Sequence, residues 1–157
     1  MSKIKTVVSS LEDAVEILSS IVREIPPELR KRRPSPEKWS AHEHACHLAE
    51  VHLMFFKRLD LMLSEKNPVI KPYFPDKDDE PDLLLKTDLD EALERFAADR
   101  KKLIEKLKQL PPEDWERTAN HEEYARYSVF IMFRHLALHD YLHIYRIEEL
   151  LLKKDWK

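Results

Sequence analysis

The sequence predicts an all-α fold, a four-helix up-down-up-down bundle built as a single domain over residues 1–157. Apolar residues recur at spacings of three and four in four long segments, which is the period of an amphipathic helix. The chain contains no glycine, whereas strand hairpins and phosphate-binding loops rely on glycine for positive φ or close backbone approach. A chain of 157 residues also fits one domain.

The first two helices have clear sequence boundaries. An apolar stripe over residues 4–25 predicts the first helix, which ends at a pair of prolines. A connector rich in proline and arginine follows, without a periodic apolar face. The second helix is expected to begin at about Ser40, because Ser40 and Glu43 have the spacing of a capping box, and to end near Glu65.

A long connector is expected between the second and third helices, over residues 66–86. It has no hydrophobic period and is rich in proline. Loops of this length inside compact domains are commonly lids or binding loops. Tyr73 and Phe74 in its middle leave two alternatives open: the connector folds back over a site, or the two aromatic rings cap one end of the core.

The third helix is expected to begin at Thr87 or Asp88 and to end near Leu110. Arg100 occupies a position on its apolar stripe where an apolar residue is expected. It either extends its charged head to water along the helix surface or points toward an anionic group inside, and we favour the first interpretation.

A second long connector, polar in composition, is expected over residues 115–127, before the fourth helix. Ser128 is placed to cap that helix, which runs to about Lys153. In an up-down-up-down bundle the second and fourth helices run parallel, so depths along them can be compared directly.

The charge pattern argues against binding to nucleic acid or to a membrane surface. The chain carries 27 basic and 30 acidic residues, which are interspersed and give a net charge of −3. A single cysteine, Cys46, excludes an intrachain disulfide and fits a reducing cytosol. The N-terminal residues lack the apolar run of a signal peptide, so we expect a cytoplasmic protein that acts on a small molecule.

Histidines are concentrated in two of the predicted helices. His135, His139 and His143 follow one another at four-residue spacing, so two of them can offer nitrogens to the same point. Burying imidazoles without partners costs on the order of a few kcal/mol, which metal coordination would offset. Spacing alone makes the pair His135 and His139 as good as the pair His139 and His143. The second helix offers four candidates for a third ligand: His42, His44, His47 and His52.

Two motifs make the chain similar to a known family. Trp39-Ser40 followed by His47-Leu48-Ala49-Glu50, together with His139-Asp140-x-x-His143-Ile144, resembles the DinB/YfiT-like family of metal-dependent enzymes. The resemblance covers the whole chain in helix order and length. It implies a four-helix bundle that binds a divalent metal through three histidines, which correspond here to His47, His139 and His143. We expect zinc or nickel as the metal and a homodimer as the assembly.

Three neutral imidazoles leave an open coordination position, as in catalytic zinc sites. Characterised members of the resembling family include transferases that use low-molecular-weight thiols, a thiol-dependent isomerase and proteins described as hydrolases. We therefore expect a metal-dependent enzyme, with transfer of a low-molecular-weight thiol ahead of hydrolysis. The alternatives are a metal-dependent hydrolase and a non-catalytic helical interaction module that retains a structural metal.

Two further residues are candidates for catalytic roles. Glu50, one turn after His47, could accept a proton or orient a ligand, although a solvated helix glutamate is the alternative. Arg146 shares a helix face with the last two histidine ligands and could anchor the acidic end of the thiol or substrate. His121 matches a histidine common in this region of the family, without an assigned role. The alternative for Arg146 is a salt bridge to one of three carboxylates: Glu50, Asp140 or Glu149.

Overall fold

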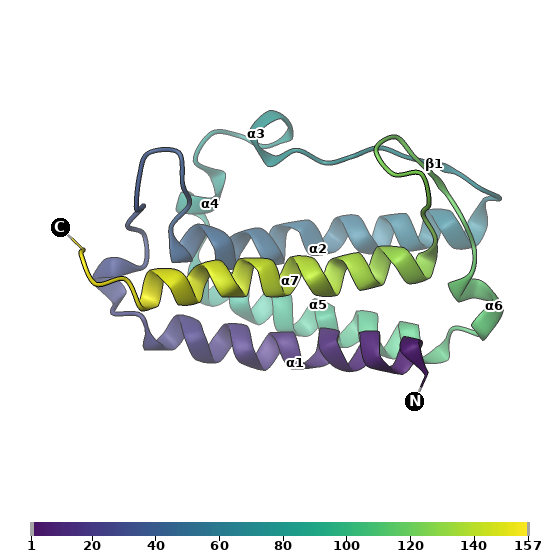
Figure 1. Ribbon diagram of the computed structural model, residues 1–157, viewed down its shortest axis with the longest axis horizontal. Helices are drawn as coiled ribbons and strands as arrows, with labels where there is room; N and C mark the ends of the chain where they lie inside the picture. The colour runs from purple at the N-terminus through teal and green to yellow at the C-terminus, as the bar shows by residue number, and fades with distance from the viewer. Residues whose placement is uncertain (1, 157) are drawn as a thin grey trace.

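The computed structural model describes residues 2–156, in which four long helices lie side by side (Figure 1). These helices confirm the predicted all-α four-helix bundle: α1 (Lys3–Glu24), α2 (Ala41–Ser64), α5 (Leu89–Gln109) and α7 (Val129–Leu151). The connectors contain short elements: η1 (Pro27–Leu29), β1 (Val69–Ile70), α3 (Pro75–Asp78), α4 (Leu83–Lys86), α6 (Pro112–Trp115) and β2 (Asn120–His121). No helix within residues 2–156 has both the length and the apolar character needed to cross a membrane.

Side-chain caps set the starts of the long helices, because the first backbone N–H groups of a helix have no partner within it. Ser2, Ser40, Asp88 and Ser128 each accept a hydrogen bond from a backbone N–H in the first turn of the following helix. The Ser40 backbone N–H also donates to Glu43 at 3.1 Å, which completes the predicted capping box. Each long helix therefore begins at a residue that its own sequence specifies.

The directions of the helices differ from the predicted up-down-up-down order. His44 on α2 lies beside His143 on α7, while Arg58, later in α2, contacts Tyr127 just before α7. As residue numbers rise along α2, those of its partners on α7 fall. The two helices are therefore antiparallel, and the prediction that they run parallel is wrong.

α5 runs in the same direction as α2, as the ion pairs Glu50–Arg95 and Asp60–Lys106 show. The order of directions is therefore up-down-down-up, with α1 and α2 each packed against both α5 and α7. Parallel neighbouring helices need a long crossover connection. The segment from residue 65 to residue 88 provides it by returning along the length of the bundle (Figure 1).

This crossover segment is fixed to the rest of the molecule at several points. β1 pairs in parallel with β2 of the second connector. Tyr73 packs against the core, and its hydroxyl donates a hydrogen bond to Asp79, while the neighbouring Phe74 is 41% exposed. The segment therefore folds back over the bundle, with Tyr73 packed against the core.

Two residues of the crossover segment adopt a backbone conformation that usually favours glycine. Asn67 and Asp82 have φ values of 50° and 60°. Asparagine and aspartate enter this region more readily than other non-glycine residues, because their short polar side chains can form local hydrogen bonds. The absence of glycine therefore does not prevent sharp turns in this chain.

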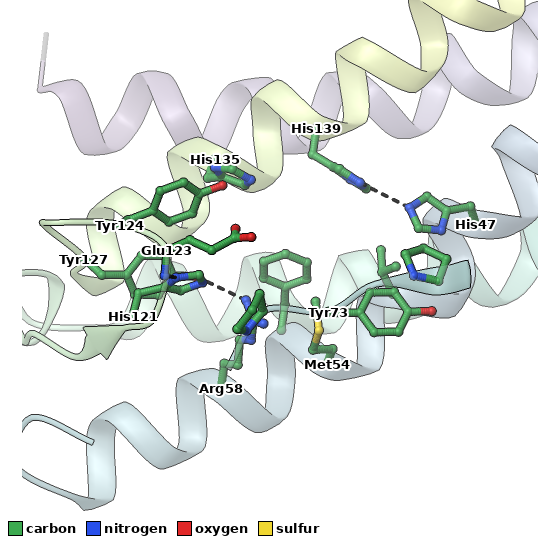
Figure 2. Close-up of a pocket in the computed structure, with 14 residues that line it drawn as sticks. His47, Met54, Arg58, Tyr73, His121, Glu123, Tyr124, Tyr127, His135 and His139 are labelled. Carbon is green, nitrogen blue, oxygen red and sulfur yellow. Dashed lines mark hydrogen bonds between the residues drawn. The ribbon is translucent and has the colours of Figure 1, made fainter. Parts of the chain in front are cut away.

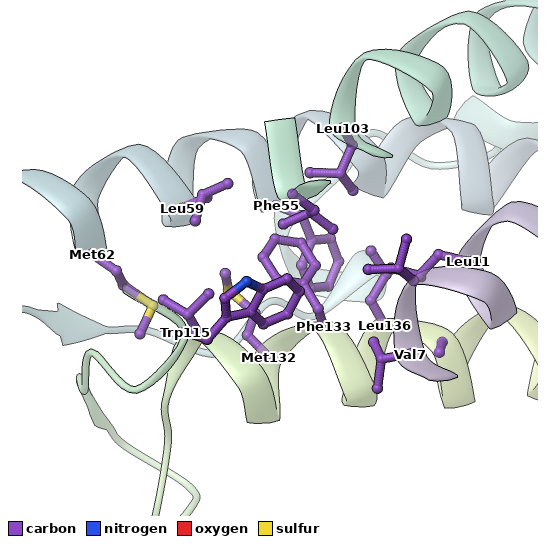
Figure 3. Close-up of a cluster of buried hydrophobic side chains, with 14 of the residues drawn as sticks. Val7, Leu11, Phe55, Leu59, Met62, Leu103, Trp115, Met132, Phe133 and Leu136 are labelled. Carbon is purple, nitrogen blue, oxygen red and sulfur yellow. The ribbon is translucent and has the colours of Figure 1, made fainter. Parts of the chain in front are cut away.

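The core consists of two clusters of buried apolar side chains. The first includes Phe133 and Trp115, whose ring centroids lie 6.2 Å apart in an edge contact (Figure 3). The second includes Phe96 and Leu18. Burial of this apolar surface, at about 25 cal/mol per Å², is the main force that holds the four helices together.

Arg100 lies on α5 between the residues that contribute to the two clusters, and it is 1% exposed. Its guanidinium donates to Asp140 on α7 at 2.7 and 3.2 Å, to His52 on α2 at 3.0 Å and to the backbone oxygen of Leu11 on α1 at 2.9 Å. The expectation that Arg100 extends to water is therefore wrong. Buried partners from the other three long helices supply the acceptors that the guanidinium needs.

Candidate metal centre

Three histidines from two antiparallel helices face one another near the middle of the bundle. The Nε2 atom of His47 lies 3.2 Å from Nε2 of His139, which in turn lies 3.2 Å from Nε2 of His143. One ligand atom from each histidine can be chosen so that all three lie within 4.8 Å of one another. The antiparallel arrangement produces this meeting, because His47 lies six residues after the start of α2 and His143 eight residues before the end of α7.

The spacing of these nitrogen atoms fits a shared metal ion. Zinc binds histidine nitrogen at about 2.0–2.1 Å, so two tetrahedral nitrogen ligands lie about 3.3 Å apart. The two Nε2 separations of 3.2 Å are close to that value. The residues present therefore fit a divalent metal bound through Nε2 of each histidine.

Burial keeps these imidazoles neutral, which is the form that binds metal. Removal from water, followed by the smaller effect of repulsion from neighbouring imidazoles, lowers the pKa of His47 to about 3, that of His139 to about 4 and that of His143 to about 2. At neutral pH the cluster therefore offers lone pairs and not positive charge.

The opposite side of His143 is supported by a fourth histidine. His44 Nδ1 lies 2.8 Å from His143 Nδ1, so one of these nitrogens donates a proton to the other. The Trp39 ring covers this group, with its centroid 4.9 Å from that of His47 and 5.9 Å from that of His143. By contrast, Nδ1 of His47 and Nδ1 of His139 have no hydrogen-bond partner among the described residues.

A cavity of about 150 Å³ adjoins the histidine cluster (Figure 2). His47 and His139 form its wall at the end nearest the cluster. The side of α2 that continues from His47 supplies Val51, Met54, Phe55 and Arg58. The connectors and α7 supply most of the remaining wall: Pro72, Tyr73, Pro75, His121, Glu123, Tyr124, Tyr127 and His135.

The predicted candidates outside the three-histidine cluster occupy several environments. His135 and His121 line the cavity, at some distance from the cluster in Figure 2. Glu50 forms an ion pair of 2.7 Å with Arg95 and lines a neighbouring surface cavity. Arg146 is exposed and donates to Glu149 at 2.7 Å, which is one of the salt bridges considered as the alternative to substrate binding.

Three other residues of α2 contribute to the packing of the fold and not to the histidine cluster. His42 Nε2 donates to the Thr87 backbone oxygen at 2.8 Å, and His52 accepts from Arg100. Cys46 is fully buried, and burial raises the pKa of its thiol to about 12. Cys46 is therefore a small buried residue, and its thiol stays protonated at neutral pH.

Sequence reasoning missed the roles of His44 and Arg58. His47, Val51, Phe55 and Arg58 recur at helical spacing, so the face of α2 that lines the cavity was visible in the sequence. The position of Arg58 in the cavity wall could not be inferred without the direction of α7. An antiparallel α7 places its N-terminal end and Tyr127 beside Arg58.

Comparisons with known proteins agree with this architecture. A family model described as the DinB superfamily matches residues 10–147. A protein of Oceanobacillus iheyensis described as a "putative metal-dependent hydrolase" is 29% identical over 150 residues, which cover 95% of this chain and 86% of the relative. A Bacillus cereus protein with the same description is 28% identical over 157 residues, with 98% and 88% of the two chains covered.

One solved structure gives a direct comparison of fold. It is YfiT from Bacillus subtilis, described as "a probable metal-dependent hydrolase with an unusual four-helix bundle topology". The TM-score is 0.84 at 21% sequence identity, and the match covers 96% of this chain and 87% of that chain. At this identity the likeness concerns the fold.

Proposed function

The chain belongs to the DinB superfamily, and on this basis we propose that it is a hydrolase that depends on a divalent metal held by His47, His139 and His143. Zinc and nickel are the metals we propose, because both accept imidazole ligands. The descriptions of the relatives from Oceanobacillus iheyensis and Bacillus cereus support hydrolysis as the reaction class.

The observation that carries this proposal is the cavity beside the cluster. A structural zinc site is closed by a fourth protein ligand, whereas a catalytic site keeps one position open toward substrate. Among the side chains that the structure describes, no fourth histidine, cysteine, aspartate or glutamate joins the three histidines as a ligand. The cavity lined by His47 and His139 gives a substrate access to the cluster, and this supports an enzyme over a structural clip.

The chain's own residues would bind and position the metal. The three histidines provide neutral ligands, His44 contacts Nδ1 of His143, and the Trp39 ring packs against His47 and His143. A bound divalent metal would supply the Lewis acidity that hydrolysis requires. Hydrogen-bonding groups that could orient a substrate line the cavity: His121, His135, Tyr124 and Tyr127.

The descriptions of the relatives favour hydrolysis over thiol transfer, which the sequence placed first. The two reactions differ in their stoichiometry. A transferase consumes a thiol for each product formed, whereas a hydrolase consumes only water. Thiol transfer, the proton-accepting role of Glu50 and the homodimer all stay predictions.

Metal-stripped protein, reloaded separately with zinc or nickel, provides the test. We expect turnover of a panel of activated esters and amides only after reloading, and without added thiol. A requirement for a low-molecular-weight thiol, consumed in step with product, would replace hydrolysis by transfer. Metal binding that raises the melting temperature without turnover on any substrate of the panel would favour the structural clip.

Two variants make the activity test specific to the site. His143→Ala removes one proposed ligand and should abolish turnover. Lys57→Gln changes an exposed residue of α2 that lies outside the histidine cluster and should keep the wild-type rate. Equal activity in wild-type protein and His143→Ala would assign the turnover to a contaminant or to another site.

A further inference from the structure

The far end of the cavity contains an arginine that forms no salt bridge with any carboxylate whose side chain the structure describes. Arg58 lines the wall, half-buried, together with Tyr124, Tyr127 and His121 (Figure 2). Its guanidinium donates to the Lys71 backbone oxygen at 2.7 Å and to the Tyr127 hydroxyl at 3.4 Å. Both acceptors are neutral, so they orient the guanidinium without neutralising its charge.

Five of the ten other arginines differ from Arg58 in this respect. Salt bridges to carboxylates engage these five: Arg33, Arg95, Arg100, Arg117 and Arg146. Among the side chains that the structure describes, no carboxylate lies within 4.0 Å of Arg58. Glu123 lines the same cavity, but its side chain is exposed to solvent. Arg58 is therefore held in place beside the cavity with its charge available to a ligand.

The surface between the histidine cluster and Arg58 is apolar. His47 and Arg58 project from one face of α2 and are about 16 Å apart along the axis at ~1.5 Å per residue. Val51, Met54 and Phe55 lie between them on this face. A ligand that reaches both ends must therefore carry an apolar segment between its charged group and its reacting group.

We propose that the cavity selects substrates with a carboxylate, which Arg58 binds at the end away from the three histidines while the apolar part of the molecule lies on α2. This proposal rests on the hydrolase function proposed above and names its substrate class. The planar fork of guanidinium donors matches a carboxylate in geometry.

The surrounding charges favour a monoanion over a phosphate dianion. Burial, followed by the charge of Arg58, lowers the pKa of His121 and that of His135, so both imidazoles are neutral donors or acceptors at neutral pH. Arg58 then provides one positive charge to the cavity, and Glu123 places a negative charge at its edge. The single positive charge of Arg58 matches one carboxylate, whereas a dianion would exceed it and would be repelled more strongly by Glu123.

Phenylacetate and phenylacetamide are suitable probes, because they share a ring and differ in charge. A cavity of about 150 Å³ accommodates a benzene ring. We would measure binding of both probes to metal-stripped wild-type protein by amide chemical shifts in a titration. The expected result is at least tenfold tighter binding of phenylacetate, in line with a charge-assisted hydrogen bond. Equal affinity for the two probes would overturn the proposal.

Variants assign the preference to Arg58. Arg58→Gln should bind the two probes equally, whereas Arg58→Lys, which keeps the charge without the fork, should retain part of the preference. Lys57→Gln makes a comparable change in charge at the adjacent exposed position and should behave as wild type. Full preference in folded Arg58→Gln, or its loss in Lys57→Gln, would contradict a specific role for Arg58. The comparison of the two probes in wild-type protein stays decisive if Arg58→Gln fails to fold.

The outcome is separable from that of the proposed reaction, since the titration uses protein without metal. Preferential carboxylate binding without any metal-dependent turnover would retain the anion site and remove the hydrolase function. Turnover by the metal-loaded protein, together with equal affinity for both probes, would retain the hydrolase function and remove the anion site.

Discussion

His44 Nδ1 lies 2.8 Å from Nδ1 of His143, so the two imidazoles share one proton across helices α2 and α7. If His143 binds a metal through Nε2, its Nδ1 carries that proton and donates it to His44. Partners of this kind fix the tautomer and orientation of a ligand, and their loss typically weakens metal binding by about 10- to 100-fold. We therefore expect His44→Ala to bind zinc about tenfold or more weakly, as measured by competition with a chelator.

The variant His44→Asn provides the matched control. The side-chain amide oxygen that it introduces can occupy nearly the position of the His44 Nδ1 atom and can accept the same hydrogen bond. Zinc affinity should therefore recover substantially in His44→Asn. Equal affinities in wild-type protein and both variants would show that His44 does not orient His143.

The buried ion pair between Arg100 and Asp140 predicts a large effect on stability. Both side chains are 1% exposed, and removal of one partner from a buried pair costs about 3–5 kcal/mol because the other charge is left without compensation. We expect Asp140→Ala to lower the free energy of unfolding by about that amount in urea denaturation of metal-free protein. The double variant Arg100→Met/Asp140→Leu should recover part of the loss. A change below about 1 kcal/mol in Asp140→Ala would contradict a structural role for the pair.

The lowered pKa of His52 is expected to make the fold less stable at acid pH. Burial and the adjacent Arg100 lower the pKa of His52 to about 3 in the folded protein, compared with about 6.5 in an unfolded chain. As the pH falls below 6.5, the unfolded chain takes up a proton that the folded protein does not. The free energy of unfolding therefore decreases from about pH 6.5 toward about pH 3.

The variant His52→Gln isolates this component, because a glutamine side chain can accept the hydrogen bond from Arg100 but does not titrate. Between pH 7 and pH 5, metal-free His52→Gln should lose about 2 kcal/mol less stability than wild-type protein. Urea denaturation at the two pH values provides the measurement. Identical losses in the two proteins would exclude His52 as a source of the acid sensitivity.

The aromatic pair Tyr73 and Phe74 of the crossover segment is expected to contribute little to global stability. Tyr73 is partly buried and Phe74 is 41% exposed, so the double variant Tyr73→Ser/Phe74→Ser should lower the melting temperature by only a few degrees. Ile70, which is 2% exposed, is the matched contrast, and Ile70→Ser should cost more. A loss of about 10 °C or more in the double variant would instead place the segment in the stable core.

The sequence predicted which segments are helical but not how they are directed. The hydrophobic period and the capping residues, such as Ser40 and Ser128, are local signals. They give the positions of the helices in the sequence but not which helices pack together or in which direction. The crossover is long enough either to join antiparallel helices or to return along the bundle. Contacts across the bundle, such as those of Arg95 and Lys106 with α2, distinguish these possibilities.

For the site, too, the sequence predicted local features but not the contacts between helices. From spacing alone, His135 and His143 were equivalent partners for His139, because each lies one turn from it. The choice depends on the level at which His47 meets α7, which is set by packing. The family resemblance pointed to His143, and the structure brings that set together. Arg58 was not predicted, since its role requires the contact with Tyr127 across the bundle.

Metal content per chain tests the central claim most directly. Purified wild-type protein and the variants His47→Ala, His139→Ala, His143→Ala and His135→Ala would be incubated with zinc or nickel, desalted and analysed by elemental mass spectrometry. We predict about one metal ion per chain in the wild type and in His135→Ala, and a large loss in the other three variants. A site that empties in His135→Ala, or that stays full when His47, His139 or His143 is replaced, would contradict the account.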